Sequence, residues 1–112
     1  MNLGPLIAAL ITVETGGCRN PDLAIGDAGL AIGALQIHRA VVVDANRIAG
    51  TSYTHQQMTN RVAARRVCEI YLSRYAAGKT NEEAARIWNG GPTGHRKSAT
   101  IAYWNKVKCH LK

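Results

Sequence analysis

The strongest constraint on the fold is an apolar run that ends in one acidic residue. Residues 3–13 read "LGPLIAALITV", and Glu14 follows directly, ahead of a Gly-Gly pair at 16–17. Pro5 suits the first turn of a helix, and the glycines suit its end. One helical face combines three aliphatic residues with the acid, at i, i+3, i+4 and i+7: Ile7, Leu10, Ile11 and Glu14. The run is shorter than the ~20 residues that cross a bilayer, so it predicts the first helix of a globular domain.

The next segment predicts a small β-like part. Residues 16–37 hold five glycines and a proline, with short apolar pieces and turns at Gly26-Asp27 and Gly29. Helical patterns then resume and predict helices over 39–49, 56–77, 80–88 behind a Thr80–Glu83 capping box, and from a Ser98 cap to about His110. The fold class is therefore α+β, mostly α, in a single domain spanning 1–112.

The net charge of +7 indicates an anionic partner, since 14 Lys and Arg stand against 7 Asp and Glu. Nucleic acid, anionic lipid and an acidic polymer such as a cell wall all meet that description. Solubility alone is the alternative explanation. Most of the basic residues are spread over 61–112 and form no block, which is unlike a nucleic-acid tail.

The three cysteines, Cys18, Cys68 and Cys109, form no CxxC pair and no zinc-site spacing with histidines. We therefore expect no metal and no cofactor, and the sequence leaves open either one disulfide or none. The apolar start has no basic segment before it and no small-residue cleavage motif ahead of Glu14, so no signal peptide is predicted.

Glu14 and Asp27 are the candidate catalytic carboxylates. A glutamate on an apolar helix face loses hydration, which raises its pKa and lets it donate a proton near neutral pH. A structural cap or an arginine pair explains Glu14 equally well on spacing alone, and Asp27 by itself suits an ordinary glycine turn. Together, one buried and one wetter carboxylate are what glycoside hydrolysis needs.

Other polar residues are weaker candidates. The four histidines, His38, His55, His95 and His110, show no metal spacing and no Ser/His/Asp order. Asp44 suits a helix cap or a salt bridge. Asn89-Gly90-Gly91 suits a tight turn, although its glycines would let a ligand approach the backbone closely.

Several stretches resemble the invertebrate-type lysozymes, the destabilase-like family. They are "ETGG", "GLAIGALQI", "VDANR", "YLSRYA" and, most specifically, "ARIWNGGPTGHRKSATIAYWNKVK". The resemblance runs from about Val13 to Lys108. Its first half is shared more loosely with goose-type lysozymes and lytic transglycosylases, which have the same helical lysozyme-like core. The resemblance implies a lysozyme-like helical domain with catalytic activity.

By this resemblance Glu14 matches the family's general acid, and Asp27 matches its second carboxylate. The sugar cleft would be lined by residues from two segments: Gln36, Ile37, His38, Asn89, Gly90 and Gly91. His38 stands where the family usually has lysine, and Val41-Val42 replaces an aromatic pair. The family is rich in disulfides and this chain has three cysteines, so a bacterial or phage relative held together by its core is expected.

The leading functional hypothesis is a muramidase that cuts the β-1,4 bond between N-acetylmuramic acid and N-acetylglucosamine in peptidoglycan. A lytic transglycosylase, which needs only the acid, is the nearest alternative. A non-catalytic wall-binding domain and a basic nucleic-acid binder rank lower. We expect a bacteriolytic monomer whose partner is the glycan strand, with no nucleic acid and no membrane insertion. It would be secreted, periplasmic or delivered to the wall by a phage.

Overall fold

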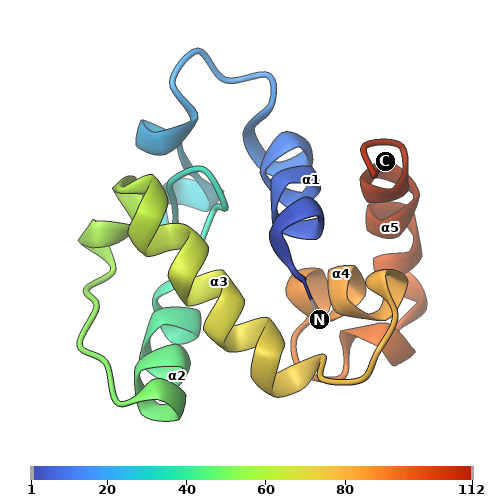
Figure 1. Ribbon diagram of the computed structural model, residues 1–112. Coiled ribbons are helices and arrows are strands. Elements are labelled where there is room, and N and C mark those ends of the chain that lie inside the picture. The colour runs from blue at the N-terminus through green and yellow to red at the C-terminus, as the bar shows by residue number, and fades with distance from the viewer. Residues whose placement is uncertain (1, 112) are drawn as a thin grey trace.

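Helix α1, Gly4–Thr15, opens the computed structural model, which describes residues 2–111. A proline lies in its first turn, and the helix ends before Gly16, as predicted. Its buried residues surround most of the helix: Leu6, Ile7, Ala9, Leu10, Ile11 and Thr15. A helix that is apolar on most sides must be enclosed by other elements, and Figure 1 shows α1 with α3 on one side and α5 on the other. Glu14 therefore lies in the last turn of an enclosed helix.

The predicted β-like segment is a two-stranded antiparallel hairpin. Strand β1, Ile25–Gly26, pairs with β2, Ala31–Ile32. The chain then turns through Gly33, whose φ of +85° is in the left-handed region. A Cβ at Gly33 would also collide with the backbone carbonyl of Met58, so glycine is required there on both counts. This close approach fixes the hairpin against the segment that leads into α3.

Helix α2, Arg39–Ala49, agrees with the prediction and ends at Gly50, which has φ +67°. The helix predicted over 56–77 is wrong at both ends. Residues 56–59 form a 3₁₀ turn, and α3 spans Arg61–Tyr75. Asn60 is the physical reason, because its backbone is extended and its side chain accepts a hydrogen bond from the Ala63 N–H, which caps a new helix.

Helix α4, Asn81–Gly90, begins with the predicted capping box between Thr80 and Glu83. The Ser98 cap is wrong. Residues 98–100 form a 3₁₀ turn, and α5 spans Ile101–Lys108 with no side-chain cap. The polar residue that organises this junction is instead Thr100, whose buried hydroxyl lies within hydrogen-bond distance of the Gly94 and Lys97 carbonyls.

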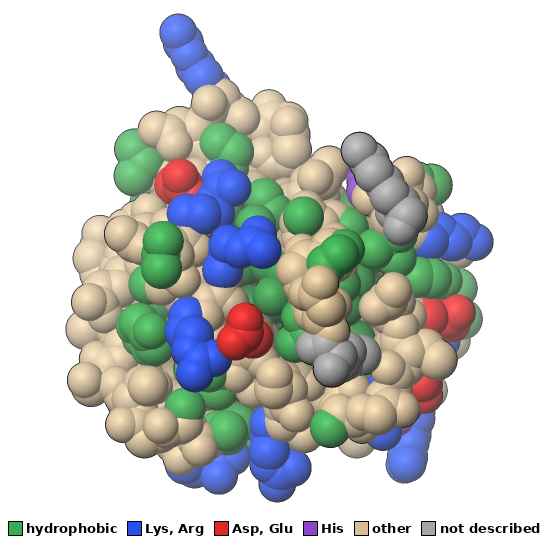
Figure 2. Space-filling model, viewed as in Figure 1, with side chains coloured by type: hydrophobic (Ala, Val, Ile, Leu, Met, Phe, Trp, Pro, Cys, Tyr) green, Lys and Arg blue, Asp and Glu red, His purple; other side chains and the backbone are tan. Residues whose placement is uncertain are grey.

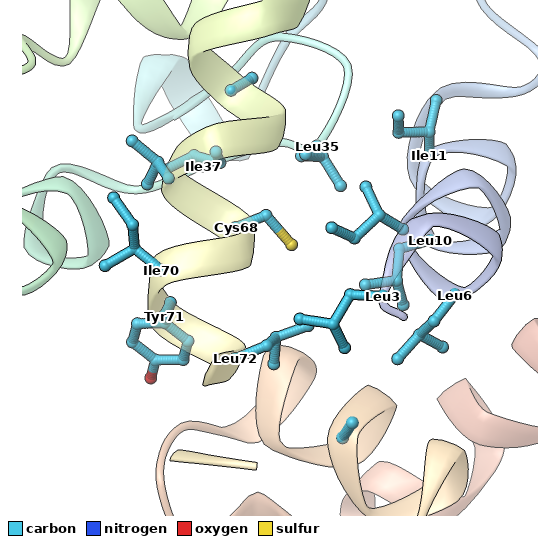
Figure 3. Close-up of a cluster of buried hydrophobic side chains, with 14 of the residues drawn as sticks. Leu3, Leu6, Leu10, Ile11, Leu35, Ile37, Cys68, Ile70, Tyr71 and Leu72 are labelled. Atoms are coloured by element: carbon cyan, nitrogen blue, oxygen red, sulfur yellow. The ribbon is translucent and has the colours of Figure 1, made fainter. Parts of the chain in front are cut away.

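The core lies between α1 and α3, closed by the loop after β2 and by α4. Figure 3 shows leucines of α1 directed toward Cys68 and Leu72 of α3, with Leu35 above them. Leu10, Leu35, Cys68 and Leu72 have no exposed surface. The three cysteines are free thiols, so burial of apolar surface holds the fold without a disulfide.

Basic side chains are dispersed over the face shown in Figure 2, and acidic ones lie among them. On α3 and its surroundings Arg61 pairs with Asp22 at 2.6 Å, and Arg66 pairs with Glu69 at 2.7 Å. The excess positive charge is therefore spread and partly paired on this side. Within residues 2–111 no helix combines the length and the apolar character that a membrane crossing requires.

Thr15 ties the Glu14 end of α1 to the loop after the hairpin. Its side chain is buried, and its hydroxyl donates to the Ala34 carbonyl oxygen at 2.8 Å. The Ile11 carbonyl oxygen, one turn earlier in α1, lies 3.2 Å from the same hydroxyl. Thr12, one turn earlier, makes only the local bond to the Ala8 carbonyl and is exposed. The two threonines thus differ in the long-range hydrogen bond and in burial.

Thr15→Val should lower the free energy of unfolding by roughly 1–3 kcal/mol, because the isosteric methyl leaves the buried Ala34 carbonyl without its donor. Thr12→Val is the matched control and should change it by no more than about 0.5 kcal/mol. Urea unfolding followed by circular dichroism measures both. Equal effects from the two variants would show that the bond to Ala34 carries no stability.

Candidate active site

The two candidate carboxylates line one cavity of about 250 Å³. Its walls come from the end of α1, the β hairpin and the loop after it, the start of α2, and the end of α4. The lining residues are Glu14, Asp27, Ala31, Gln36, Ile37, His38, Val41, Trp88 and Asn89. Segments far apart in the sequence therefore meet around Glu14.

Glu14 is held in a position that favours the protonated acid. Its side chain is partly buried, and burial raises the pKa of the carboxyl above its ordinary value of 4.5. Three neighbours oppose this shift: the Tyr103 hydrogen bond most strongly, then the charges of His38 and Lys106. The net direction is upward, so the predicted desolvation of Glu14 is confirmed. Such a carboxyl can give up a proton to a leaving group.

Tyr103 of α5 is the direct partner of Glu14. Its hydroxyl donates to Glu14 Oε2 at 2.8 Å. Burial, together with the nearby Glu14 charge, raises the pKa of Tyr103 above its ordinary value of 10, so the hydroxyl keeps its proton and stays a donor. The bond leaves Oε1 as the oxygen not engaged by Tyr103. Sequence reasoning missed this residue, because 89 positions separate the pair and no local pattern links them.

Asp27 occupies the turn of the hairpin in a strained conformation. Its φ is +52°, a region that aspartate tolerates better than most residues. The side chain is 63% exposed, and Oδ2 lies 3.1 Å from His38 Nε2. Asp27 is therefore the wetter carboxylate of the pair, as the sequence predicted, and His38 holds it at the cavity wall.

Gln36 and Ile37 line the cavity but are also part of the hairpin's framework. The Gln36 side-chain amide lies 3.2 Å from the Ala24 carbonyl and 2.9 Å from the Gly33 carbonyl and donates to both. The Gln36 backbone has φ +51°. Ile37 is buried, and its carbonyl lies 2.7 Å from His55 Nε2. The donor side of Gln36 is thus occupied within the protein.

The three residues of the Asn89-Gly90-Gly91 segment differ in their position relative to the cavity. Asn89 is exposed and lines the cavity. Gly90 ends α4 and packs on Thr100, since a Cβ there would lie 2.6 Å from Thr100 Cγ2. Gly91 follows with φ +90°. Among the described residues around the cavity, neither glycine is part of the wall, and both shape the turn that leaves α4.

The structure adds Ala31, Val41 and Trp88 to the wall, none of which was a sequence candidate. Trp88 was detectable in principle, because it precedes Asn89 in the segment that carries the strongest resemblance. Asp44, expected to be a cap or an ion-pair residue, bonds to Arg47 and Tyr75 outside the cavity. No group of three or more His, Cys, Asp or Glu side chains in the described part of the chain could hold a metal ion.

A helical domain whose first helix brings a shielded carboxyl to a cavity that a second carboxylate also lines is typical of a glycosidase of the lysozyme-like class. No protein-family profile matches the chain. The lysozyme of Meretrix lusoria is 36% identical over 102 residues, which cover 84% of this chain and 82% of the relative. The lysozyme of Ostrea edulis is 33% identical, covering 85% and 71%. The chain belongs to the invertebrate-type lysozyme family.

Solved structures agree with this assignment. Meretrix lusoria lysozyme in complex with Aeromonas hydrophila PliI superposes with a TM-score of 0.75 at 28% identity, over 95% of this chain and 88% of that one. The inhibitor-bound lysozyme from the same organism gives a TM-score of 0.74 at 32% identity, with the same coverage. The expected fold class and family are thereby confirmed.

Tyr103→Phe should raise the pKa of Glu14 further. The hydroxyl stabilises the ionised carboxylate, and its removal leaves desolvation less opposed. Titration of the Glu14 side-chain carboxyl by carbon-13 NMR measures the shift. Tyr53→Phe, in the connection between α2 and α3, is the control and should leave the titration unchanged. A Glu14 pKa that stays constant or falls in Tyr103→Phe would contradict the assigned hydrogen bond.

Proposed function

We propose that this protein is a muramidase that cleaves the β-1,4 bond between N-acetylmuramic acid and N-acetylglucosamine in peptidoglycan. The observation that carries the proposal is the placement of Glu14, whose pKa is raised by burial, and an exposed Asp27 on the walls of one cavity. The relatives named lysozyme support the same reaction class. No cofactor enters the proposed chemistry.

In the proposed reaction Glu14 donates its proton to the glycosidic oxygen as the bond to the muramic acid C1 breaks. Positive charge develops at C1, and Asp27 stabilises it, attacks it or activates the incoming water. Tyr103 keeps the Glu14 carboxyl in one orientation during this transfer. Gln36, Ile37, His38 and Asn89 would form the surrounding sugar-binding wall, and Gly90 and Gly91 would act only through the turn after Asn89.

A glycan strand would place one segment in the cavity of about 250 Å³ and continue outside it. The +7 net charge suits an anionic wall polymer. Such a substrate places the protein's work at the wall, after secretion or in a periplasm.

A lytic transglycosylase is the second candidate, and one observation favours it. Asp27 is 63% exposed and already paired with His38, so Glu14 is the only one of the two carboxylates that the fold shields. In that reaction the muramic acid 6-hydroxyl attacks C1 instead of water. Mass spectrometry of digested peptidoglycan separates the candidates. Reducing ends indicate hydrolysis, and 1,6-anhydro ends indicate transglycosylation. Intact strands would indicate that the protein is a non-catalytic cell-wall-binding domain.

Glu14→Gln should reduce peptidoglycan lysis by at least roughly 10²–10⁴-fold, because the amide keeps the shape but has no acidic proton. The fall in turbidity of a suspension of bacterial cell walls gives the rate of lysis.

Folding of Glu14→Gln is checked by thermal unfolding at pH 7, where the variant should be as stable as the wild type or more stable. Burial raises the pKa of Glu14 in the folded state, so its ionisation costs stability as the pH rises, and the variant's advantage should vanish below about pH 4.5. Near-complete lysis by Glu14→Gln would refute the acid assignment.

Asp27→Asn distinguishes the two reactions. A hydrolase that relies on the second carboxylate should lose activity nearly as severely as Glu14→Gln, whereas a transglycosylase should stay active. His38→Gln is the matched variant, since it removes the imidazole that contacts Asp27 but keeps the Asp27 carboxylate. His38→Gln should lower the rate of peptidoglycan cleavage less than Asp27→Asn does. Full activity of Asp27→Asn, with anhydro products, would remove Asp27 from the proposed mechanism.

A further inference from the structure

Trp88 is one of the residues that line the cavity with the two carboxylates. It lies one residue before Asn89 near the end of α4, and both side chains line the wall. The side chain is only partly buried, although it packs against the core. In the described lining, the other apolar side chains are the aliphatic Ala31, Ile37 and Val41. Trp88 is therefore the largest aromatic side chain among the described lining residues.

A chain of aromatic contacts holds Trp88 in place from behind. Its ring meets Tyr71 of α3 edge-on, with centroids 5.7 Å apart and planes at 83°. Tyr71 in turn contacts Tyr75 at 4.8 Å, and the Tyr75 hydroxyl donates to Asp44 of α2. Aromatic pairs in such geometry stabilise the structure beyond the effect of the area that they bury. The indole is thus anchored to α2 and α3 before any ligand arrives.

An anchored, partly exposed indole suits a pyranose ring. One face of such a sugar presents C–H groups with slight positive charge, and the face of an indole is negative. A rigid aromatic also loses little conformational entropy on binding, in contrast to a long flexible side chain. Asn89 beside it offers amide groups that can hydrogen-bond an N-acetyl substituent. Stacking and amide recognition from adjacent residues fit an N-acetylated sugar.

We propose that Trp88 is a sugar-binding platform, on which one N-acetylhexosamine ring of the glycan stacks within reach of Glu14. This rests on the proposed function for its substrate class. The role is binding, since the indole takes no part in proton transfer. Loss of the platform should therefore weaken binding and raise KM, while the pH dependence set by Glu14 stays the same.

The test uses the full chain carrying Glu14→Gln, so that the ligand is not cleaved. The ligand is a tetrasaccharide of alternating N-acetylglucosamine and N-acetylmuramic acid, and calorimetry gives its Kd. Adding Trp88→Leu should raise the Kd on the order of tenfold or more. The Kd of the Trp88→Phe protein should lie between those of the parent and of Trp88→Leu. The matched control is Trp104→Phe in α5, the chain's other tryptophan, which should bind as tightly as its parent. A Kd within twofold of the parent for Trp88→Leu, or no binding by the parent itself, would overturn the platform.

A second measurement avoids any dependence on folding of the leucine variant. The Glu14→Gln protein labelled with 5-fluorotryptophan should show two fluorine NMR signals, assigned through Trp104→Phe. Titration with the tetrasaccharide should move the Trp88 signal more than the Trp104 signal, and the reverse order would refute the proposal.

Peptidoglycan digestion by the wild-type protein, measured in parallel, tests the proposed function separately. Trp88-dependent binding without cleavage would refute the muramidase and keep the platform. Cleavage of peptidoglycan together with binding that does not depend on Trp88 would keep the muramidase and refute the platform.

Discussion

The site depends on the burial of one carboxyl group at the end of a helix. Glu14 is the one charged residue of α1, and its desolvation opposes folding whenever it is ionised. The Tyr103 hydroxyl compensates part of that cost with one hydrogen bond from α5. The rest of the molecule must keep water away from one side of this group and admit a substrate from the other.

The framework around the carboxyl meets both needs with few polar contacts. Thr15 ties the end of α1 to the Ala34 carbonyl, and Gly33 allows the same loop to approach Met58 closely. The hairpin is thereby held at the cavity that the end of α4 also lines. Because every cysteine is a free thiol, this geometry relies on packing of the core between α1 and α3. Changes in that packing would move the carboxyl relative to the hairpin.

The two carboxylates have similar chemistry but different environments in the fold. Glu14 lies on a rigid helix and is shielded, whereas Asp27 lies on an exposed turn and contacts His38. The aromatic contacts from Trp88 through Tyr71 to Tyr75 link this cavity residue to α3 and, through Asp44, to α2. An acid, a wetter carboxylate and an aromatic surface thus come from three separate parts of the fold.

The sequence by itself determined the first helix, the β-like turn and the capping box at Thr80, because each depends on residues within a few positions of one another. Spacing left the desolvation of Glu14 open, because it depends on the helices that enclose α1. Sequence reasoning misplaced the starts of α3 and α5, where Asn60 and Thr100 act through contacts that periodicity does not encode. Only the tertiary structure decided that Tyr103 bonds to Glu14, that Trp88 joins the wall and that Gly90 does not. Those facts depend on contacts between helices whose residues are far apart in the chain, and local spacing carries no record of them.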